Sequence, residues 1–191
     1  MCKTGLATLA IFYCDFRDKN KQNARNLLSS ILIQLCHQSD AFSQVLSSVY
    51  STHDDGFQQP SIDALREGLK RMLNLPGQGA LYLVVDALDE CPNSSEYPTP
   101  RAQVLDVMEA LINMQLVHVH FCITSRPEVD IKDILEPLAT HNLPLHEQAG
   151  QKQDILDYIN HFVHSDRNAK RWRDEDKQLV VETLTEKARG M

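Results

Sequence analysis

Residues 80–91 constrain the fold more than any other stretch of the chain. They read Ala-Leu-Tyr-Leu-Val-Val-Asp-Ala-Leu-Asp-Glu-Cys, so an apolar run leads into Asp86, and Asp89 and Glu90 follow. A continuous apolar run with β-branched and aromatic residues predicts a strand buried on both faces. Parallel strands present functional groups at their carboxyl ends, where these acids lie. Because carboxylates beside a dry core are costly, we expect water, a cation or a basic partner there. The alternative is a strand that ends in a solvated acidic turn.

The size and charge of the chain exclude several classes of protein. A length of 191 residues fits one domain with a sizeable core. A net charge of −7 argues against binding to nucleic acid or to an anionic membrane, because both need a concentrated basic surface. No apolar run approaches the roughly 20 residues of a membrane span, and the N-terminus does not resemble a signal peptide. The cysteines are odd in number, without a Cys-x-x-Cys pair, which favours reduced thiols and a cytoplasmic protein.

Apolar periodicity predicts alternating strands and helices along the rest of the chain. Strands are expected over 6–16 and 117–124, with a weak edge strand at 143–145 that Pro144 limits. Helices are expected over 24–35, 42–50, 62–73, 104–112, 131–138, 155–163 and 179–184, with Ser61, Thr99 and Asp174 as N-caps. This alternation indicates an α/β domain with a mainly parallel sheet. In such a sheet Asp86 and Arg126, each following a strong strand, lie on the same edge.

Four segments together resemble a known family. Tyr-Cys-Asp-Phe-Arg-Asp at 13–18, Arg-Asn-Leu-Leu-Ser-Ser at 25–30, Val-Asp-Ala-Leu-Asp-Glu-Cys at 85–91 and Ile-Thr-Ser-Arg-Pro-Glu at 123–128 occur in order and at fitting separations. They resemble fungal NACHT domains of NLR-like proteins, often described as nephrocystin-like N-terminal domains. The resemblance covers nearly the whole chain and is weak beyond Gln148. It implies a P-loop NTPase-like three-layer fold in a switch protein of the STAND class.

The resemblance also implies roles for individual residues. Asp86 is similar to the Walker B acid, which holds Mg²⁺ through water. Asp89, with Glu90 beside it, is similar to the catalytic group that positions the attacking water. Arg126 is similar to the sensor 1 arginine, which reads the γ-phosphate of ATP or GTP. Sites of this kind work by positioning the phosphates and neutralising their charge, and these residue types suit that work.

The sequence departs from the family at the phosphate-binding loop. The motif G-x-x-x-x-G-K-[ST], whose amides and lysine cradle the phosphates, does not occur, and Lys3-Thr4 has no preceding glycines. We therefore expect an internal piece of a NACHT domain that lacks the P-loop strand and helix. Residues 1–148 are expected to form the partial core and residues 149–191 to start a helical region. The strand before Arg126 is expected to have an uncovered edge, and the isolated chain to associate through it.

Three other constellations have weaker support. His118, His120 and Cys122 alternate along one predicted strand, a spacing that suits zinc, but no fourth ligand is indicated and packing is the preferred interpretation. Cys91 has no base paired with it in sequence, so we expect a packed thiol rather than a nucleophile. Trp172 stands in a mixed-charge run and is expected to be a surface anchor rather than a base-stacking residue.

Two classes of function remain open at this point. The chain is either part of a NACHT nucleotide switch that acts with other domains or protomers of an NLR-like protein, or a non-enzymatic scaffold that has lost nucleotide binding. In the first case we expect no hydrolysis by the chain alone and no cofactor bound tightly by it. A third and weaker interpretation is a magnesium-dependent hydrolase that uses Asp86, Asp89 and Glu90 by themselves.

Overall fold

The computed structural model describes residues 7–51, 58–94, 97–144 and 149–187. The chain divides into two compact units, Met1–Ala139 and Thr140–Met191. Each unit is described by itself below. The expected boundary between a nucleotide-binding core and a helical region, at 148/149, stays a prediction. Lys3-Thr4 and Leu145 lie outside the described residues.

The first unit is built on a three-stranded parallel sheet in the order β1-β2-β3. The strands are β1 (Ala7–Tyr13), β2 (Ala80–Asp86) and β3 (Val119–Ile123). Leu83 of β2 pairs with Ala10 on one side and with Phe121 on the other. The predicted parallel pairing is therefore confirmed, although β1 ends earlier than the predicted strand over 6–16 because the chain turns after Cys14, whose N–H makes the last bond of the ladder.

The helices of the first unit begin where the sequence offers capping side chains. Asn23, Ser61 and Thr99 each accept a hydrogen bond from the backbone N–H three residues ahead, which satisfies an otherwise unpaired donor. Ser61 and Thr99 had been predicted as caps. The elements are α1 (Ala24–Cys36), α2 (Asp40–Ser51), α3 (Ile62–Leu73), α4 (Pro100–Ile112) and α5 (Val129–Leu135), with short 3-10 turns η2 (Lys19–Lys21), η4 (Leu88–Glu90) and η5 (Glu136–Leu138).

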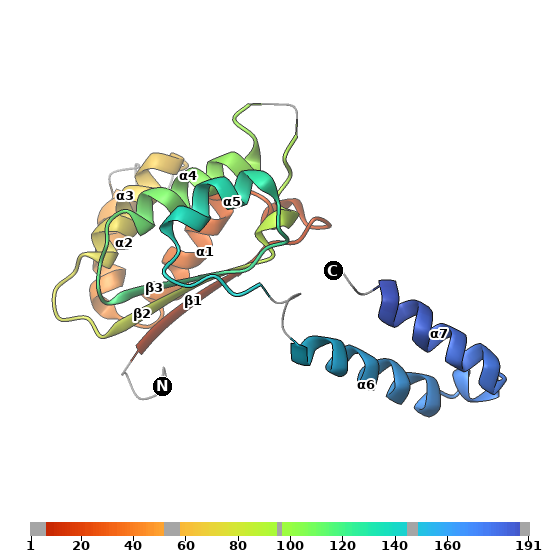
Figure 1. The fold of residues 1–191 in the computed structure, drawn as a ribbon. Coiled ribbons are helices and arrows are strands. Elements are labelled where there is room, and N and C mark those ends of the chain that lie inside the picture. The colour runs from red at the N-terminus through yellow and green to blue at the C-terminus, as the bar shows by residue number, and fades with distance from the viewer. Residues whose placement is uncertain (1–6, 52–57, 95–96, 145–148, 188–191) are drawn as a thin grey trace. The chain divides into compact units, whose positions relative to one another are not determined.

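The core of this unit lies on one face of the sheet. Ala10, Leu83 and Val85 are fully buried on the face that the helices cover (Figure 1). On the other face the side chains of Tyr13 and Tyr82 are 57% and 41% exposed. The predictions of a strand buried on both faces and of three layers are therefore wrong for this unit, which has one sheet and helices on one side of it. A continuous apolar run shows that both faces are apolar, but not that both are covered.

The second unit contains two longer helices with a small core of their own. They are α6 (Ala149–Ser165) and α7 (Asp174–Lys187), with the 3-10 turn η7 (Ala169–Arg171) between them. Ile159 and Val163 of α6 are buried against Val181 of α7. Asp174 is the first residue of α7 and not its predicted N-cap.

Other predictions for the two units are settled by the described residues. The structure places Leu143 and Pro144 outside any strand, because Pro144 lacks the N–H that a sheet ladder needs. Among these residues no helix has the length and apolar composition needed to cross a bilayer.

Candidate functional site

The predicted acids and arginine all lie where β2 and β3 end, a region called the rim below (residues 86–91 and 124–126). Asp86 is the last residue of β2, and Thr124 follows β3 directly. The Thr124 hydroxyl donates a hydrogen bond to Asp86 Oδ1 and accepts one from the Ala87 N–H at 2.9 Å. Thr124 therefore orients the Asp86 carboxylate and ties the two strand ends together. The prediction that Asp86 and Arg126 lie at the same end of the sheet, where the parallel strands finish, is confirmed.

A sharp turn directs the next two acids away from Asp86. Ala87 has a φ of 54°, in the left-handed region that only glycine adopts at no steric cost. Leu88 is fully buried and donates its backbone N–H to Thr124 O at 2.9 Å, which holds the turn against β3. Strained backbone of this kind persists only where its surroundings fix it, and it occurs often at functional sites. An alanine in this conformation gives no signal in the sequence.

Asp89 contacts Arg126 across the rim. Its Oδ1 accepts a hydrogen bond from the Arg126 backbone N–H at 3.0 Å, and its Oδ2 lies 3.4 Å from Arg126 Nε. The Asp89 side chain is only 11% exposed, whereas that of Arg126 is 79% exposed. Asp89 is thus held in place, and the guanidinium of Arg126 is free to move because an exposed ion pair restrains it weakly.

Glu90 points to a third partner, the loop after β1. Its Oε2 accepts a hydrogen bond from the Phe16 backbone N–H at 3.0 Å. In the same loop Arg17 binds both carboxylate oxygens of Asp15. The Arg17 hydrogen bonds lower the pKa of Asp15 to about 2. The three acids of residues 86–90 therefore bind a hydroxyl, an arginine and a main-chain amide, each at a different place.

Arg101 binds the main chain of the rim, and the sequence analysis assigned it no role. It lies on α4 with little exposure, and its guanidinium donates to Cys91 O at 2.9 Å and to Asp89 O at 2.6 Å. It also pairs with Asp130 of α5 at 3.3 Å. A buried arginine fully used in this way fixes the path of the acidic turn. Two of its partners are main-chain carbonyls, which no residue pattern reveals.

Cys14 and Cys91 meet beneath the acidic turn. Their sulfur atoms lie 3.5 Å apart and share a hydrogen bond, and both residues are buried. This hydrogen bond and burial raise the pKa of the Cys14 thiol. The same hydrogen bond, together with the charge of Arg101, lowers the pKa of Cys91 against the effect of burial. Cys91 is a packed thiol, as predicted, but its contact with another cysteine was not foreseen.

The arrangement offers one carboxylate suited to magnesium held through water. Within the described ranges, no three His, Cys, Asp or Glu side chains are placed to share a metal ion. Asp86 lies at the strand end and uses Oδ1 to accept from Thr124. Mg²⁺ keeps several waters and takes other ligands from bound phosphates, so a single oriented carboxylate fits it in that setting. Among the rim residues Arg126 alone carries a guanidinium, and its side chain is exposed.

The histidines on and beside β3 are used in packing. His118 Nε2 lies 3.0 Å from Leu73 O, and the His120 ring stacks on Tyr82 with centroids 4.9 Å apart. Cys122 is exposed. The zinc interpretation, already disfavoured, has no support in this geometry.

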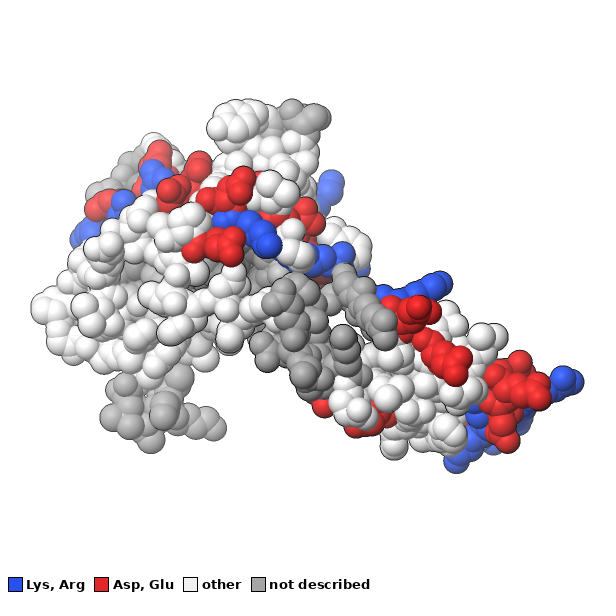
Figure 2. Space-filling model, viewed as in Figure 1, with Lys and Arg blue, Asp and Glu red and all other residues white. Residues whose placement is uncertain are grey.

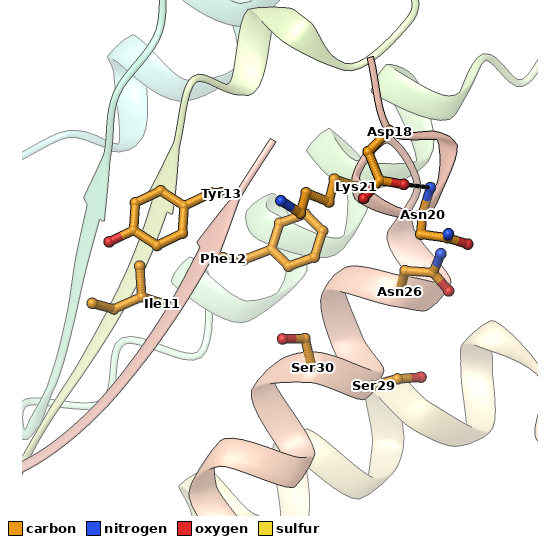
Figure 3. Close-up of a pocket in the computed structure, with 9 residues that line it drawn as sticks. All are labelled: Ile11, Phe12, Tyr13, Asp18, Asn20, Lys21, Asn26, Ser29 and Ser30. Atoms are coloured by element: carbon orange, nitrogen blue, oxygen red, sulfur yellow. Dashed lines mark hydrogen bonds between the residues drawn. The ribbon is translucent and has the colours of Figure 1, made fainter. Parts of the chain in front are cut away.

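A hollow of about 410 Å³ lies between the end of β1, η2 and α1 (Figure 3). Its lining combines Tyr13 at the end of β1, Lys21 of η2 and polar side chains of α1 that include Asn26 and Ser30. The volume is within the range of small-molecule pockets. The sequence analysis assigned no role to these residues.

Charged side chains show no segregation on the face seen in Figure 2. Acidic and basic residues are interspersed there on both units. With a net charge of −7, this face is unlike the concentrated basic surface that nucleic-acid binding needs.

The comparisons with known proteins give one match. The family model described as Nephrocystin 3, N-terminal, matches residues 2–126, which include every residue of the rim. No curated protein and no solved structure matches the chain.

Proposed function

The chain belongs to the nephrocystin 3 N-terminal family, and from this premise we propose that it is part of a NACHT-type nucleotide switch. The longer protein would be NLR-like, of the fungal kind that the sequence resembles, and its other domains or protomers would be the partners of this chain. In this proposal the chain contributes the Walker B and sensor 1 residues and is inactive alone. Its thiols, two of which lie 3.5 Å apart as free cysteines, support a reducing, cytoplasmic setting.

The proposal rests chiefly on the contact between Asp89 and Arg126 beside Asp86. Acids that follow one strand and an arginine that follows the next meet at 3.4 Å, on the edge where α/β sheets bind ligands. Phosphate-plus-magnesium chemistry needs this pairing of charges. The strained turn at Ala87 and the buried Arg101 hold the acids in place, which supports a role beyond a solvated turn.

Each residue has a distinct role in this proposal. Asp86, oriented by Thr124, would hold the magnesium of a bound nucleotide through water. Asp89 and Glu90 would position the attacking water. Arg126 would leave its exposed contact with Asp89 and pair with the γ-phosphate. Magnesium bound with the nucleotide would neutralise phosphate charge, which the acids by themselves would repel.

The residues present do not supply the other half of a phosphate site. The sequence has no G-x-x-x-x-G-K-[ST] motif, so the cradle of amides and a lysine is not provided by this chain. Arg126 alone adds one positive charge. We therefore expect binding of ATP or GTP to be in the millimolar range or weaker, about −4 kcal/mol or less in magnitude.

Calorimetric titration with Mg-ATP and Mg-GTP tests this proposal. The chain itself should show no saturable binding below millimolar concentrations. A fusion with a P-loop segment from a NACHT protein ahead of residue 6 should bind, and Asp86→Ala should weaken its magnesium dependence. Asp106→Ala, an exposed acid on α4, is the matched control and should change nothing. A fusion that folds and remains unable to bind would contradict the proposal.

A scaffold without nucleotide binding is the second candidate, and one observation favours it. Asp89 and Glu90 already accept hydrogen bonds from the backbone N–H groups of Arg126 and Phe16, as purely structural acids do. In that case Asp89→Asn would lower stability equally in the chain and in the fusion, with nucleotide absent or present.

The self-sufficient hydrolase has less support, because Asp86, Asp89 and Glu90 bind separate partners and do not converge. Micromolar nucleotide binding by the chain as it is, lost in Asp86→Ala, would revive it.

A further inference from the structure

We propose that Cys14 and Cys91 form a dithiol site that a hydroperoxide oxidises to a disulfide. The two residues are 77 positions apart in sequence, yet their sulfur atoms lie 3.5 Å apart. A disulfide bond needs a separation of about 2.05 Å, so the sulfurs have to move about 1.5 Å closer. The proposal does not depend on nucleotide binding.

The fold brings the two thiols together through elements that are firmly held. Cys14 follows β1 and continues its ladder, since its backbone N–H donates to Asp86 O at 2.9 Å. Cys91 follows the acidic turn, and its carbonyl accepts from Arg101 Nε at 2.9 Å. Because both backbones are anchored, the short sulfur–sulfur distance is a property of the fold and not of a mobile loop.

Burial determines which reagents can reach this pair. Cys14 is 5% exposed and Cys91 is fully buried, whereas Cys122 is exposed on β3. Of the four cysteines that the structure describes, Cys122 should therefore react first with a bulky alkylating reagent. A small hydroperoxide can enter during local opening of the rim, and a sulfur oxidised there finds a second thiol in contact with it.

The reaction balances with a hydroperoxide as oxidant. One thiolate attacks a peroxide oxygen, the O–O bond breaks, and a sulfenic acid forms with release of one water from hydrogen peroxide. The second thiol attacks the sulfenic sulfur, the S–O bond breaks, and the disulfide forms with release of a second water. Two thiols lose two electrons and two protons in total, and the peroxide is reduced to two waters.

Mass spectrometry of the native protein tests the proposal. The folded chain is treated with hydrogen peroxide, remaining thiols are blocked with N-ethylmaleimide in denaturant, and the protein is digested without reductant. We expect a loss of two hydrogen atoms per chain, a cross-linked peptide pair that contains Cys14 and Cys91, and full reversal by dithiothreitol. The proposal would be overturned if peroxide oxidised Cys122 or Cys36 while Cys14 and Cys91 both still reacted with N-ethylmaleimide.

Matched variants separate geometry from general reactivity. Cys36→Ser and Cys122→Ser should retain the cross-link, whereas Cys14→Ser and Cys91→Ser should lose it. If a buried serine prevents folding, the cross-linked peptides identified in the unsubstituted chain still decide the test. The same oxidation in urea should abolish the preference for this pair. An equal yield of the Cys14–Cys91 link from the unfolded chain would show that the fold does not create the site.

Discussion

The two edges of the sheet are finished in opposite ways. Along the outer edge of β1, Gln34 of α1 and Gln38, which follows shortly after the end of α1, bind the main chain as a neighbouring strand would. Gln34 accepts from the Ile11 N–H at 2.9 Å and donates to Ile11 O at 2.8 Å. Gln38 does the same for Leu9, at 3.1 and 2.7 Å. These two side chains, four residues apart, thus pair with Leu9 and Ile11 in place of a neighbouring strand.

The outer edge of β3 has no such cover within the part of the chain that the structure describes. In a parallel ladder alternate residues bond to the same neighbour, and His118 and Thr124 bond to β2. The N–H and C=O groups of Phe121 and Ile123 therefore point outward, and the structure shows no partner for them among the described residues. Unpaired edges of this kind recruit other strands.

The contrast indicates where the sheet ends and where it can grow. A pair of glutamines that satisfies both donor and acceptor groups closes β1 to further strands. The side of β3, next to Arg126, is where an additional strand can pair. This agrees with the expectation of an uncovered edge beside Arg126, and it makes the association expected of the isolated chain a property of β3 alone.

Removal of the glutamine cover should have the largest effect. Gln34→Ala with Gln38→Ala deletes four hydrogen bonds to β1, each worth about 0.5–1 kcal/mol net at this partly exposed edge, against a small gain in helix propensity at position 34. We expect the free energy of unfolding to fall by about 2–3 kcal/mol in urea titration. The opened edge should also increase association, measured by light scattering.

Gln103→Ala is the control for this double substitution, because Gln103 makes one long hydrogen bond to Pro98 O at an exposed site. Its effect should stay within about 0.5 kcal/mol. A double variant as stable as the control would show that the glutamines do not cover the edge.

This cover shows what sequence patterns cannot supply. The parallel pairing follows from the alternation of strands and helices, the caps at Ser61 and Thr99 follow from local rules, and both were predicted correctly. The roles of Gln34 and Gln38 depend on the rotation of α1 and its distance from β1. A glutamine on a helix has the same appearance in sequence whether it meets solvent or a strand edge.

Hydrogen exchange compares the two edges directly. The Leu9 and Ile11 amides are bonded to glutamine side chains, whereas those of Phe121 and Ile123 face outward without a partner in the described structure. We expect at least roughly tenfold slower exchange for the first pair, measured by NMR under native conditions. Equal protection of all four amides would mean that another segment or a second chain pairs with β3.

The rim was easier to predict than its supports. Asp86, Asp89 and Arg126 meet because parallel strands end on one side, a rule that needs only the strand assignments. Thr124 was quoted within a motif but given no role, since a hydroxyl after a strand has many uses. Arg101 and the turn at Ala87 depend on the folded path of the main chain. The open face of the sheet was mispredicted because apolar residues do not reveal whether anything covers them.

Extension of the glutamine cover should stabilise the protein slightly. Ser30, Gln34 and Gln38 follow one another at intervals of four residues, the first two in α1 and the third just after its end. Ser30 has a shorter side chain than glutamine and lines the hollow of Figure 3 together with Tyr13, whose main chain points outward by the alternation of the ladder. Ser30→Gln would place a third glutamine there, for a gain of up to about 1 kcal/mol in urea titration and slower exchange of the Tyr13 amide. Ser29→Gln, with the same change in helix propensity, should leave that amide unchanged. An unaltered Tyr13 amide in both variants would contradict this geometry.

The smallest expected effect concerns the ion pair that follows the covered strand. Arg17 lowers the pKa of Asp15 to about 2, so the folded state binds this proton less readily than the unfolded state does. The stabilisation is therefore fully present above about pH 4 and is lost as the pH falls toward 2. It should be small because the pair is exposed to solvent. A carboxyl NMR titration should give a midpoint near 2 for Asp15.

Arg17→Gln should return the Asp15 midpoint toward the usual range, whereas Lys19→Gln, which removes the same charge without contact, should move it little. An Asp15 midpoint that stays in the usual range in the unsubstituted chain would show that Arg17 does not hold the loop after β1, and that this edge is fixed by its glutamines alone.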